Sequence, residues 1–167
     1  MGFKKDVTVL KPFKPGYVFW GKYLQENQFL SLTAHCLDVA LVFRALCNLN
    51  SIQRSLAKAA ENQLTEEQLD RLAVLAMLHD IGKANLGFQQ KVFNSKSLRA
   101  GHIRELAPLL DFDDIDIKLY EAFSQSLPPE MATWFSDEKN AYSYLMASFS
   151  HHGQPLYFQG KRGAFAR

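Results

Sequence analysis

Residues 72–83, LAVLAMLHDIGK, form the stretch around which the rest of the chain is organised. Four of its residues recur at the i, i+3, i+4, i+7 spacing of a buried helix face: Leu72, Leu75, Ala76 and His79. We therefore predict an apolar helix that ends on His79-Asp80. A buried histidine beside a carboxylate costs free energy unless something pairs with both. A metal ion would do so, because imidazole and carboxylate both bind Zn, Mn or Fe. The alternative is a helix that ends on a solvated His-Asp pair, since helix C-termini often carry histidine.

Gly82 and Lys83 follow this pair. Gly82 fits the end of a helix, where a residue in the left-handed conformation is often needed. Lys83 lies one turn past His79 and could contact the non-bridging oxygens of a phosphate, or it could be an exposed lysine favoured by the helix dipole. The two residues do not form a P-loop, because Met77 stands at the position of the first glycine and Ala84 replaces the Ser or Thr.

The chain has five histidines, and each lies at the end or on the apolar face of a predicted helix or close to one: His35, His79, His102, His151 and His152. Taken singly, a histidine is more often structural than a metal ligand. Together with Asp80 they supply enough ligands for two metal ions, which Asp80 can bridge. Two ions about 3.5–4 Å apart stabilise both the attacking and the leaving oxygen of a phosphodiester.

This order of motifs resembles the HD superfamily of metal-dependent phosphohydrolases. Three strings are more specifically similar to the HD nuclease domain of the CRISPR-associated helicase-nuclease of type I systems: residues 35–40 (HCLDVA), 79–91 (HDIGKANLGFQQK) and 151–155 (HHGQP). The resemblance covers roughly residues 17–155. It implies an all-α HD-domain helical bundle with a metal site at its centre. It also implies one or two divalent transition-metal ions (Mn, Fe, Ni, Co or Zn) and hydrolysis of phosphodiester bonds in single-stranded DNA during CRISPR antiviral defence.

The resemblance also assigns roles to residues. It implies that one ion is held by His35, His79 and Asp80, and the other by Asp80, His102, His151 and His152. Asp80 and Lys83 are the expected catalytic residues. His151 and His152 diverge by about 100° on a regular helix, so both reach one ion only if the helix ends there. Gly153 and Pro155 favour such an end.

Two features depart from the family pattern. Ile103 follows His102 where glycine is usual, and the later aspartate that completes the first metal site has no match before Arg167. The helicase part is also absent, so we expect a nuclease domain that is cut short or lacks its last ligand. The ion at His35 and His79 should then bind more weakly than the other one.

Charge is unevenly distributed after the HD pair. Residues 83–104 hold five basic side chains and no acidic one, whereas residues 105–138 hold nine acidic side chains and one lysine. A basic stretch beside a metal cluster suits a polyanionic substrate, although it could be a solvated basic loop. We expect five residues to contact nucleic acid: Lys83, Lys91, Lys96, Arg99 and Arg104. Phe88 and Phe93 could stack on bases, but anchors in the hydrophobic core are the more common use of such side chains.

Length and composition indicate one domain with its own core, because the chain has 167 residues and 47% hydrophobic content. We divide it into an irregular N-terminal arm (1–30), the HD nuclease domain (31–155) and a C-terminal loop or truncated remainder (156–167). No secretory signal or membrane-length apolar run is evident. Cys36 and Cys47 lie too far apart along one predicted helix to pair. Reduced thiols and the lack of a targeting signal favour the cytoplasm, so we expect a cytoplasmic protein that is not attached to a membrane. The resemblance adds a helicase domain or subunit and the guide-RNA surveillance complex as partners.

Capping signals locate the helices, and no alternating β pattern appears. Ser31 or Thr33 should cap a helix to about residue 48 that places Val39, Val42 and Leu46 on one face with His35. Ser51 should cap a polar helix to about residue 63, and Thr65 with Gln68 should form a capping box for the central helix. Further helices are expected over residues 84–94, 115–127 and 129–135. The last one should be capped by Asp137 and run to His152.

Two other functions use the same residues. An HD phosphohydrolase acting on nucleotides would share the metal ligands but would need a closed pocket with contacts to the base. A degenerate HD domain would serve only as an interaction module, and the missing aspartate favours that possibility.

Overall fold

The computed structural model describes residues 18–23, 28–93, 100–106, 117–127 and 129–153. These residues are mostly helical, with a single two-stranded sheet among them, which confirms the expected all-α class. The C-terminal loop and residues 94–99 of the basic stretch lie outside the described residues.

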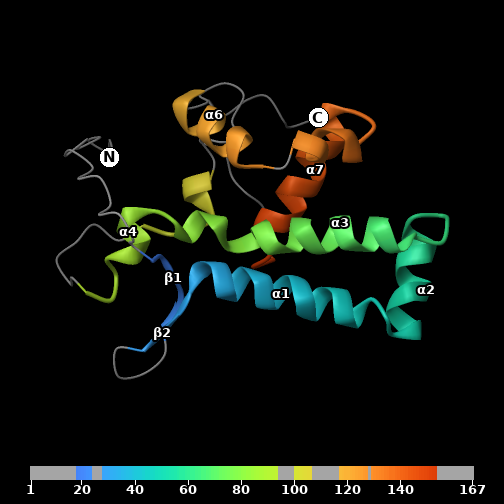
Figure 1. Cartoon of the computed structure of the whole chain (residues 1–167), viewed down its shortest axis with the longest axis horizontal. Coiled ribbons are helices and arrows are strands. Elements are labelled where there is room, and N and C mark those ends of the chain that lie inside the picture. Colours follow the sequence, from blue (N-terminus) through green and yellow to red (C-terminus); the bar gives the residue numbers. More distant parts are fainter. Residues whose placement is uncertain (1–17, 24–27, 94–99, 107–116, 128, 154–167) are drawn as a thin grey trace.

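Two long antiparallel helices form the frame of the domain (Figure 1). α1 (Leu32–Leu46) packs along α3 (Glu66–Met77), and α2 (Asn50–Ala59) closes the end where α1 stops and α3 begins. The sequence explains two of the helix starts. The Ser31 hydroxyl accepts the Ala34 N–H at 3.1 Å, and Thr65 forms the expected capping box with Gln68.

A second group of helices covers the other side of α3 (Figure 1): α6 (Ile117–Ser126), the 3₁₀-helix η3 (Pro129–Trp134) and α7 (Glu138–Phe149). α7 packs on α3, and the Ser148 hydroxyl donates to the Leu75 carbonyl at 2.6 Å. The hydrophobic core next to α3 and α7 is built on five buried side chains: Leu75, Leu78, Leu106, Met131 and Phe149. Burying a side chain of this kind stabilises the fold by about 1.5–3 kcal/mol.

The stretch before α1 contains a small sheet where we expected only irregular chain. β1 (Trp20–Tyr23) pairs antiparallel with β2 (Phe29–Ser31), with an irregular register between Trp20 and Lys22. The strands are too short for an alternating pattern to be visible in the sequence. They join the start of α1 directly, because the Leu32 N–H donates to the Phe19 carbonyl at 2.7 Å.

The central helix ends earlier than its apolar stripe predicted. α3 stops at Met77, and residues Leu78–Lys83 form the 3₁₀-helix η1. A 3₁₀-helix has three residues per turn, so Asp80 and Lys83 lie above one another on the same face. The chain then enters α4 (Leu86–Gln89), while the 3₁₀-helix η2 (Arg104–Leu106) follows later.

Two local predictions were wrong. Ser51 does not cap α2, because the helix begins at Asn50 and its N-cap residue Leu49 makes no side-chain hydrogen bond. Phe93 is 60% exposed, so it is not a core anchor within the described residues. Val42 and Leu46 lie in α1 as expected, but they are 59% and 47% exposed. The described elements cover α1 mainly where α3, η1 and the sheet pack on it.

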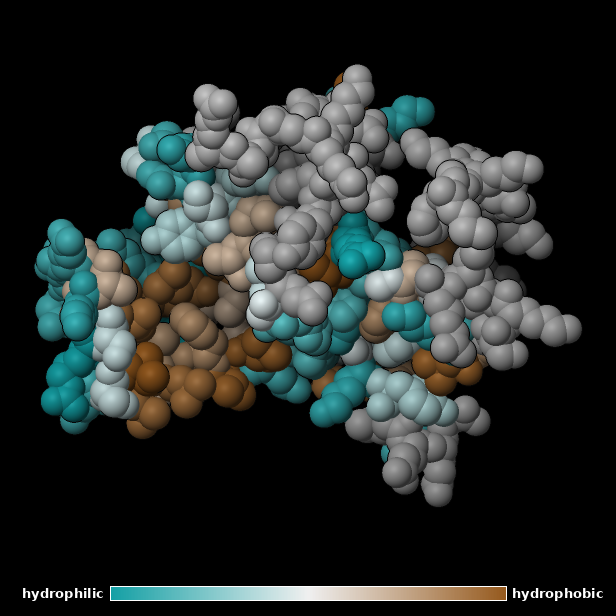
Figure 2. Space-filling model, turned by 180° about the vertical axis from the view of Figure 1, so that it is seen from behind, coloured by the Kyte–Doolittle hydropathy of each residue, from teal (hydrophilic) through white to brown (hydrophobic). Residues whose placement is uncertain are grey.

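The outer face of α1 is consequently apolar. Its exposed hydrophobic side chains continue into α2: Leu37, Leu41, Val42, Leu46, Leu49 and Ile52. Figure 2, which shows the molecule from behind, has a broad apolar area towards the α2 end. Among the described residues no single helix has the length and hydropathy to cross a bilayer, although α1 and α2 meet those criteria together as a pair bent by 92°.

Candidate metal centre

Asp80 lies at the centre of the cluster that the sequence singled out. Its side chain is 4% exposed, and it sits in η1 between α1 and the end of α7. Oδ2 faces His35 Nε2 at 2.8 Å and His79 Nε2 at 3.1 Å. Oδ1 faces His102 Nε2 at 3.3 Å and His151 Nε2 at 3.4 Å, but it accepts no hydrogen bond from the described residues.

The structure brings the six predicted ligands together although they span residues 35–152. They fall into two groups, within each of which the potential ligand atoms lie within 4.8 Å of one another. We call His35, His79 and Asp80 the first group, and His102, His151 and His152 the second group. The histidines are divided as in the two expected ligand sets, and Asp80, although it belongs to the first group, also faces His102 and His151 of the second.

Each histidine of the first group is oriented by the element that holds it. His35 lies in the first turns of α1, after the Ser31 cap. His79 Nδ1 lies 2.8 Å from the Ala76 carbonyl oxygen, and since a carbonyl only accepts, Nδ1 carries the proton. A neutral His79 thus presents the lone pair of Nε2 to Asp80 Oδ2. Two lone pairs 3.1 Å apart are stabilised only when a proton or a cation lies between them.

The second group comes from two chain segments that end near Asp80. His102 precedes η2, while His151 and His152 follow the last turn of α7. α7 ends at Phe149 and Gly153 has a positive φ of 70°, so the expected end of the helix is present just where both histidines must turn inward. His152 Nε2 lies 3.1 Å from His102 Nε2.

The pKa shifts in the cluster suit metal ligands. Burial raises the pKa of Asp80, but its close contacts with His79 and the Lys83 ammonium group outweigh burial, so the net pKa is well below its usual range. Burial lowers the pKa of His102 to about 4 and also lowers that of His151, each against a partly opposing effect of Asp80. Near neutral pH, Asp80 is therefore a carboxylate and both rings are neutral, which are the forms that bind metal.

The distances also fit an ion. Two ligand atoms bound at about 2.1 Å to one ion stand roughly 3.0–3.4 Å apart in octahedral or tetrahedral geometry. The contacts of Asp80 with the four histidines that face it span 2.8–3.4 Å. An enclosed carboxylate oxygen without a hydrogen bond is costly unless something positive compensates it. The residues present therefore fit a divalent metal ion.

The comparison with protein families agrees with this geometry. The family model described as "Cas3, HD domain" matches residues 20–166. The chain belongs to the Cas3 HD-domain family. Neither the comparison with curated proteins nor the one with solved structures gave a match. Membership gives this HD domain a metal-dependent nuclease role in CRISPR systems, and HD domains bind divalent metals.

Lys83 points towards the cluster of His35, His79, Asp80, His102, His151 and His152, which we call the HD centre, and is not a solvated surface residue. Its side chain is 13% exposed, and Nζ lies 2.5 Å from Asp80 Oδ2 and 2.9 Å from the Gly21 carbonyl oxygen. The 3₁₀ geometry of η1 produces this contact, because residues i and i+3 align. The alternative of an exposed lysine favoured by the helix dipole is thereby excluded.

The other predicted nucleic-acid contacts are described only in part. Lys91 Nζ lies 4.5 Å from the centre of the Phe88 ring, and that ring packs edge-on against His102. Arg104 is exposed, whereas Lys96 and Arg99 lie outside the described residues. Phe88 is 7% exposed, which favours the core role for this ring.

Three residues that shape the HD centre were not recognised from the sequence: Gly21, Asn85 and Gln89. The Asn85 amide nitrogen donates to the Gly82 and Gly101 carbonyls at 2.6 and 2.9 Å, which ties the His102 segment to η1. Its Oδ1 accepts the Phe88 N–H at 2.7 Å, an N-cap pattern that could have been predicted. The roles of Gly21 and Gln89 depend on long-range packing that leaves no local signal.

Gly82 has a different role from the one predicted. Its φ is not positive, so it is not a left-handed helix end. A Cβ at this position would instead lie 1.8 Å from the His102 carbonyl oxygen. Gly82 is required because the segment with His102 passes directly over it.

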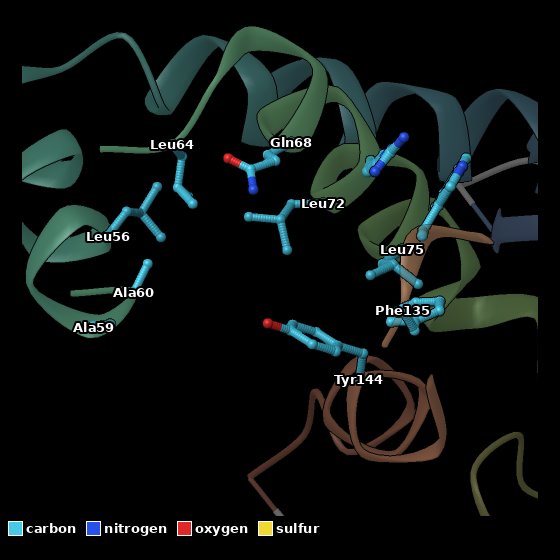
Figure 3. A pocket seen from close by; sticks show the side chains of 11 residues that line it. Leu56, Ala59, Ala60, Leu64, Gln68, Leu72, Leu75, Phe135 and Tyr144 are labelled. Carbon is cyan, nitrogen blue, oxygen red and sulfur yellow. The ribbon is translucent and has the colours of Figure 1, made fainter. Parts of the chain in front are cut away.

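A pocket of about 340 Å³ lies elsewhere in the HD domain, between α2, α3, η3 and α7. Figure 3 shows apolar side chains around it, among them Leu56, Leu72 and Phe135, with Gln68 and Tyr144 adding polar atoms. None of its lining residues is a histidine, cysteine or carboxylate. This pocket therefore offers no histidine, cysteine or carboxylate ligand for a metal ion.

Proposed function

We propose that this Cas3 HD domain hydrolyses phosphodiester bonds of single-stranded DNA at the Asp80 cluster during CRISPR antiviral defence. The main support is that five histidines gather around one buried carboxylate, Asp80, whose Oδ1 accepts no hydrogen bond from the described residues. When bound, one or two divalent transition-metal ions (Mn, Fe, Ni, Co or Zn) supply hydroxide near neutral pH and positive charge at the phosphate oxygens.

The side chains contribute position and charge. Asp80 remains ionised because its pKa is lowered, and it directs one oxygen to each ligand group. His35 and His79 would hold one ion with Oδ2, while His102, His151 and His152 would hold the other with Oδ1. Lys83 has a second acceptor in the Gly21 carbonyl, so its ammonium group stays beside the cluster and can bind a non-bridging phosphate oxygen.

A polymeric substrate fits the surroundings better than a mononucleotide. His151 and His152 are exposed, so the cluster opens onto the surface and does not lie in a closed cavity. Lys91 and the exposed Arg104 add positive charge near His102, which suits a strand that carries one phosphate per nucleotide. We expect strand binding to weaken steeply as the salt concentration rises.

The test is to measure bound metal and cleavage of a labelled single-stranded oligonucleotide with Mn²⁺, with mononucleotides as the control substrate. Asp80→Asn should lose both ions and reduce cleavage to background, because it removes the shared negative charge. Asp38→Asn, a change at an exposed carboxylate on α1, is the matched control and should leave both unchanged. Faster hydrolysis of mononucleotides would favour the nucleotide phosphohydrolase. Absence of metal and of hydrolysis would favour an interaction module.

We also propose that the domain works in the cytoplasm, without a membrane, beside a helicase domain or subunit and the guide-RNA surveillance complex. The support is the family, in which the HD domain is part of Cas3. Co-purification of this chain with a helicase and the guide-RNA complex from cells would test the association.

A further inference from the structure

Gln89 is a buried polar residue that the proposed chemistry does not use. Among the described residues the buried polar or charged side chains are Asp80 and Gln89, and Gln89 is 0% exposed. A buried amide is costly unless its donors and acceptor are all paired. Here Oε1 accepts the Trp20 N–H at 2.9 Å, and Nε2 donates to the carbonyls of Trp20 at 2.9 Å and Lys83 at 2.8 Å.

These bonds join two parts of the chain. The amide of Gln89 pairs with both backbone groups of Trp20, as a neighbouring strand would, and it also holds the end of η1 at Lys83. The Trp20 indole returns a further bond, from Nε1 to the Gln89 carbonyl at 2.9 Å. The Trp20 ring packs on Phe88 with centroids 4.7 Å apart. Gln89 therefore fixes β1 against the segment that carries His79 and Asp80.

The residue after Trp20 contacts the metal cluster. Gly21 sits at the irregularity in the β1–β2 register, and such a bulge redirects the backbone. A Cβ on Gly21 would lie 2.8 Å from His35 Cβ and 2.9 Å from Leu32 Cα, so β1 packs directly on the turn of α1 that carries His35. The Gly21 carbonyl accepts Lys83 Nζ at 2.9 Å. One backbone position thus supports both a first-group histidine and the lysine beside Asp80.

We propose that Gln89 is a positioning residue of the first group: by fixing Trp20 it keeps Gly21 packed on His35 and the Gly21 carbonyl on Lys83. Without the hydrogen bonds of Gln89, Gly21 would no longer pack on His35. The Lys83 ammonium group would then have only Asp80 Oδ2 as an acceptor, where it competes with a metal ion. Both effects weaken the ion at the first group. The second group comes from segments that Gln89 does not bond, so its ion should be unaffected. The inference rests on the proposed function, because it needs metal to bind at Asp80.

The test is calorimetric titration of the full chain with Mn²⁺, in which the first-group ion is identified as the binding step that His35→Gln removes. Gln89→Met keeps the shape of the side chain but loses its three hydrogen bonds. We expect about tenfold weaker binding at that step, as is common for residues that orient ligands. Leu69→Ala is the control for lost stability, because Leu69 is 4% exposed and lies beside α2. It should lower the melting temperature without changing either affinity.

A second measurement needs no variant. Coupling between two sites is reciprocal, so Zn²⁺ binding to the unmodified chain should slow hydrogen exchange of the β1 amides. Three outcomes would overturn the inference alone: unchanged Mn²⁺ affinity in Gln89→Met, equal weakening in Leu69→Ala, or unchanged β1 exchange. Failure of the unmodified chain to bind Mn²⁺ would overturn the proposed function itself, and the inference with it.

Discussion

The two ligand groups around Asp80 are built in different ways. The first group lies on α1 and η1, which pack on each other, and its side chains are 20%, 12% and 4% exposed for His35, His79 and Asp80. The second group lies where segments begin or end: His102 before η2, and His151 with His152 after α7. The first group is therefore fixed by regular structure, and the second by how separate segments meet.

Charge differs between the groups as well. Asp80 Oδ2, on the side of the first group, already has Lys83, His35 and His79 within 3.1 Å. Oδ1 faces the second group and accepts no hydrogen bond from the described residues. A cation would thus replace existing partners on one side and compensate an unpaired oxygen on the other. The second group should therefore bind its ion more tightly than the first group.

The largest effect should come from removing one histidine of each group. His102→Gln replaces the ring with an uncharged side chain and should abolish the tighter Mn²⁺-binding step. His35→Gln should abolish only the weaker one. Because changes at residues that only orient the ligands already cost 10–100-fold in affinity, loss of a ligand should cost at least about a hundredfold. Titration calorimetry of both variants and the unmodified chain gives the two steps.

Two equally tight steps in the unmodified chain would contradict this asymmetry. They would mean that a residue outside the described ones completes the first group, or that Lys83 moves away from Asp80 without cost. Lys83→Met separates these explanations. It should tighten the first-group step if the ammonium competes with the ion, and leave it unchanged if another residue dominates.

A smaller effect should follow from Gly82→Ala, which acts on the second group through the backbone. The added Cβ would lie 1.8 Å from the His102 carbonyl oxygen, so the His102 segment must shift. We expect a loss of about 1–3 kcal/mol in the free energy of unfolding, typical of overpacking. We also expect weaker binding at the step that His102→Gln removes, with the first-group step retained. Gly87→Ala, in the half-buried part of α4, serves as the control for adding a methyl group nearby. Loss of the first-group step alone would contradict the division into two groups.

The same contrast explains what the sequence could predict. His79-Asp80, the capping box at Thr65 and the apolar stripe are local patterns, and the helical class and the HD family follow from them. The convergence of His102 with His151 depends on tertiary packing, so it was inferred through the family resemblance and not from spacing. The 3₁₀ form of η1, the close approach at Gly82 and the Gln89 clamp have no local signature. These three features arise from tertiary packing, because the buried polar groups around Asp80 need hydrogen-bond partners once the helices have packed.

The smallest effect we expect is on the pH dependence of stability in the metal-free chain, and it should be concentrated in the second group. Burial lowers the pKa of His102 to about 4, whereas an unfolded histidine titrates at about 6.5. Between these values the unfolded state binds a proton that the folded state does not, so stability falls as pH falls through the window. The lowered pKa of His151 adds an effect of the same sign. Asp80 contributes only below this window. Its pKa is lowered, so it stabilises the fold at pH values above the unfolded pKa of about 3.9, and this stability is lost as the pH falls further.

Thermal unfolding of the metal-free chain in a chelator at pH 7, 5.5 and 4.5 should show the decline in stability, and His102→Gln should make this decline shallower. An equally steep decline in His102→Gln would assign the lost stability to other groups and remove this difference between the two halves of the centre.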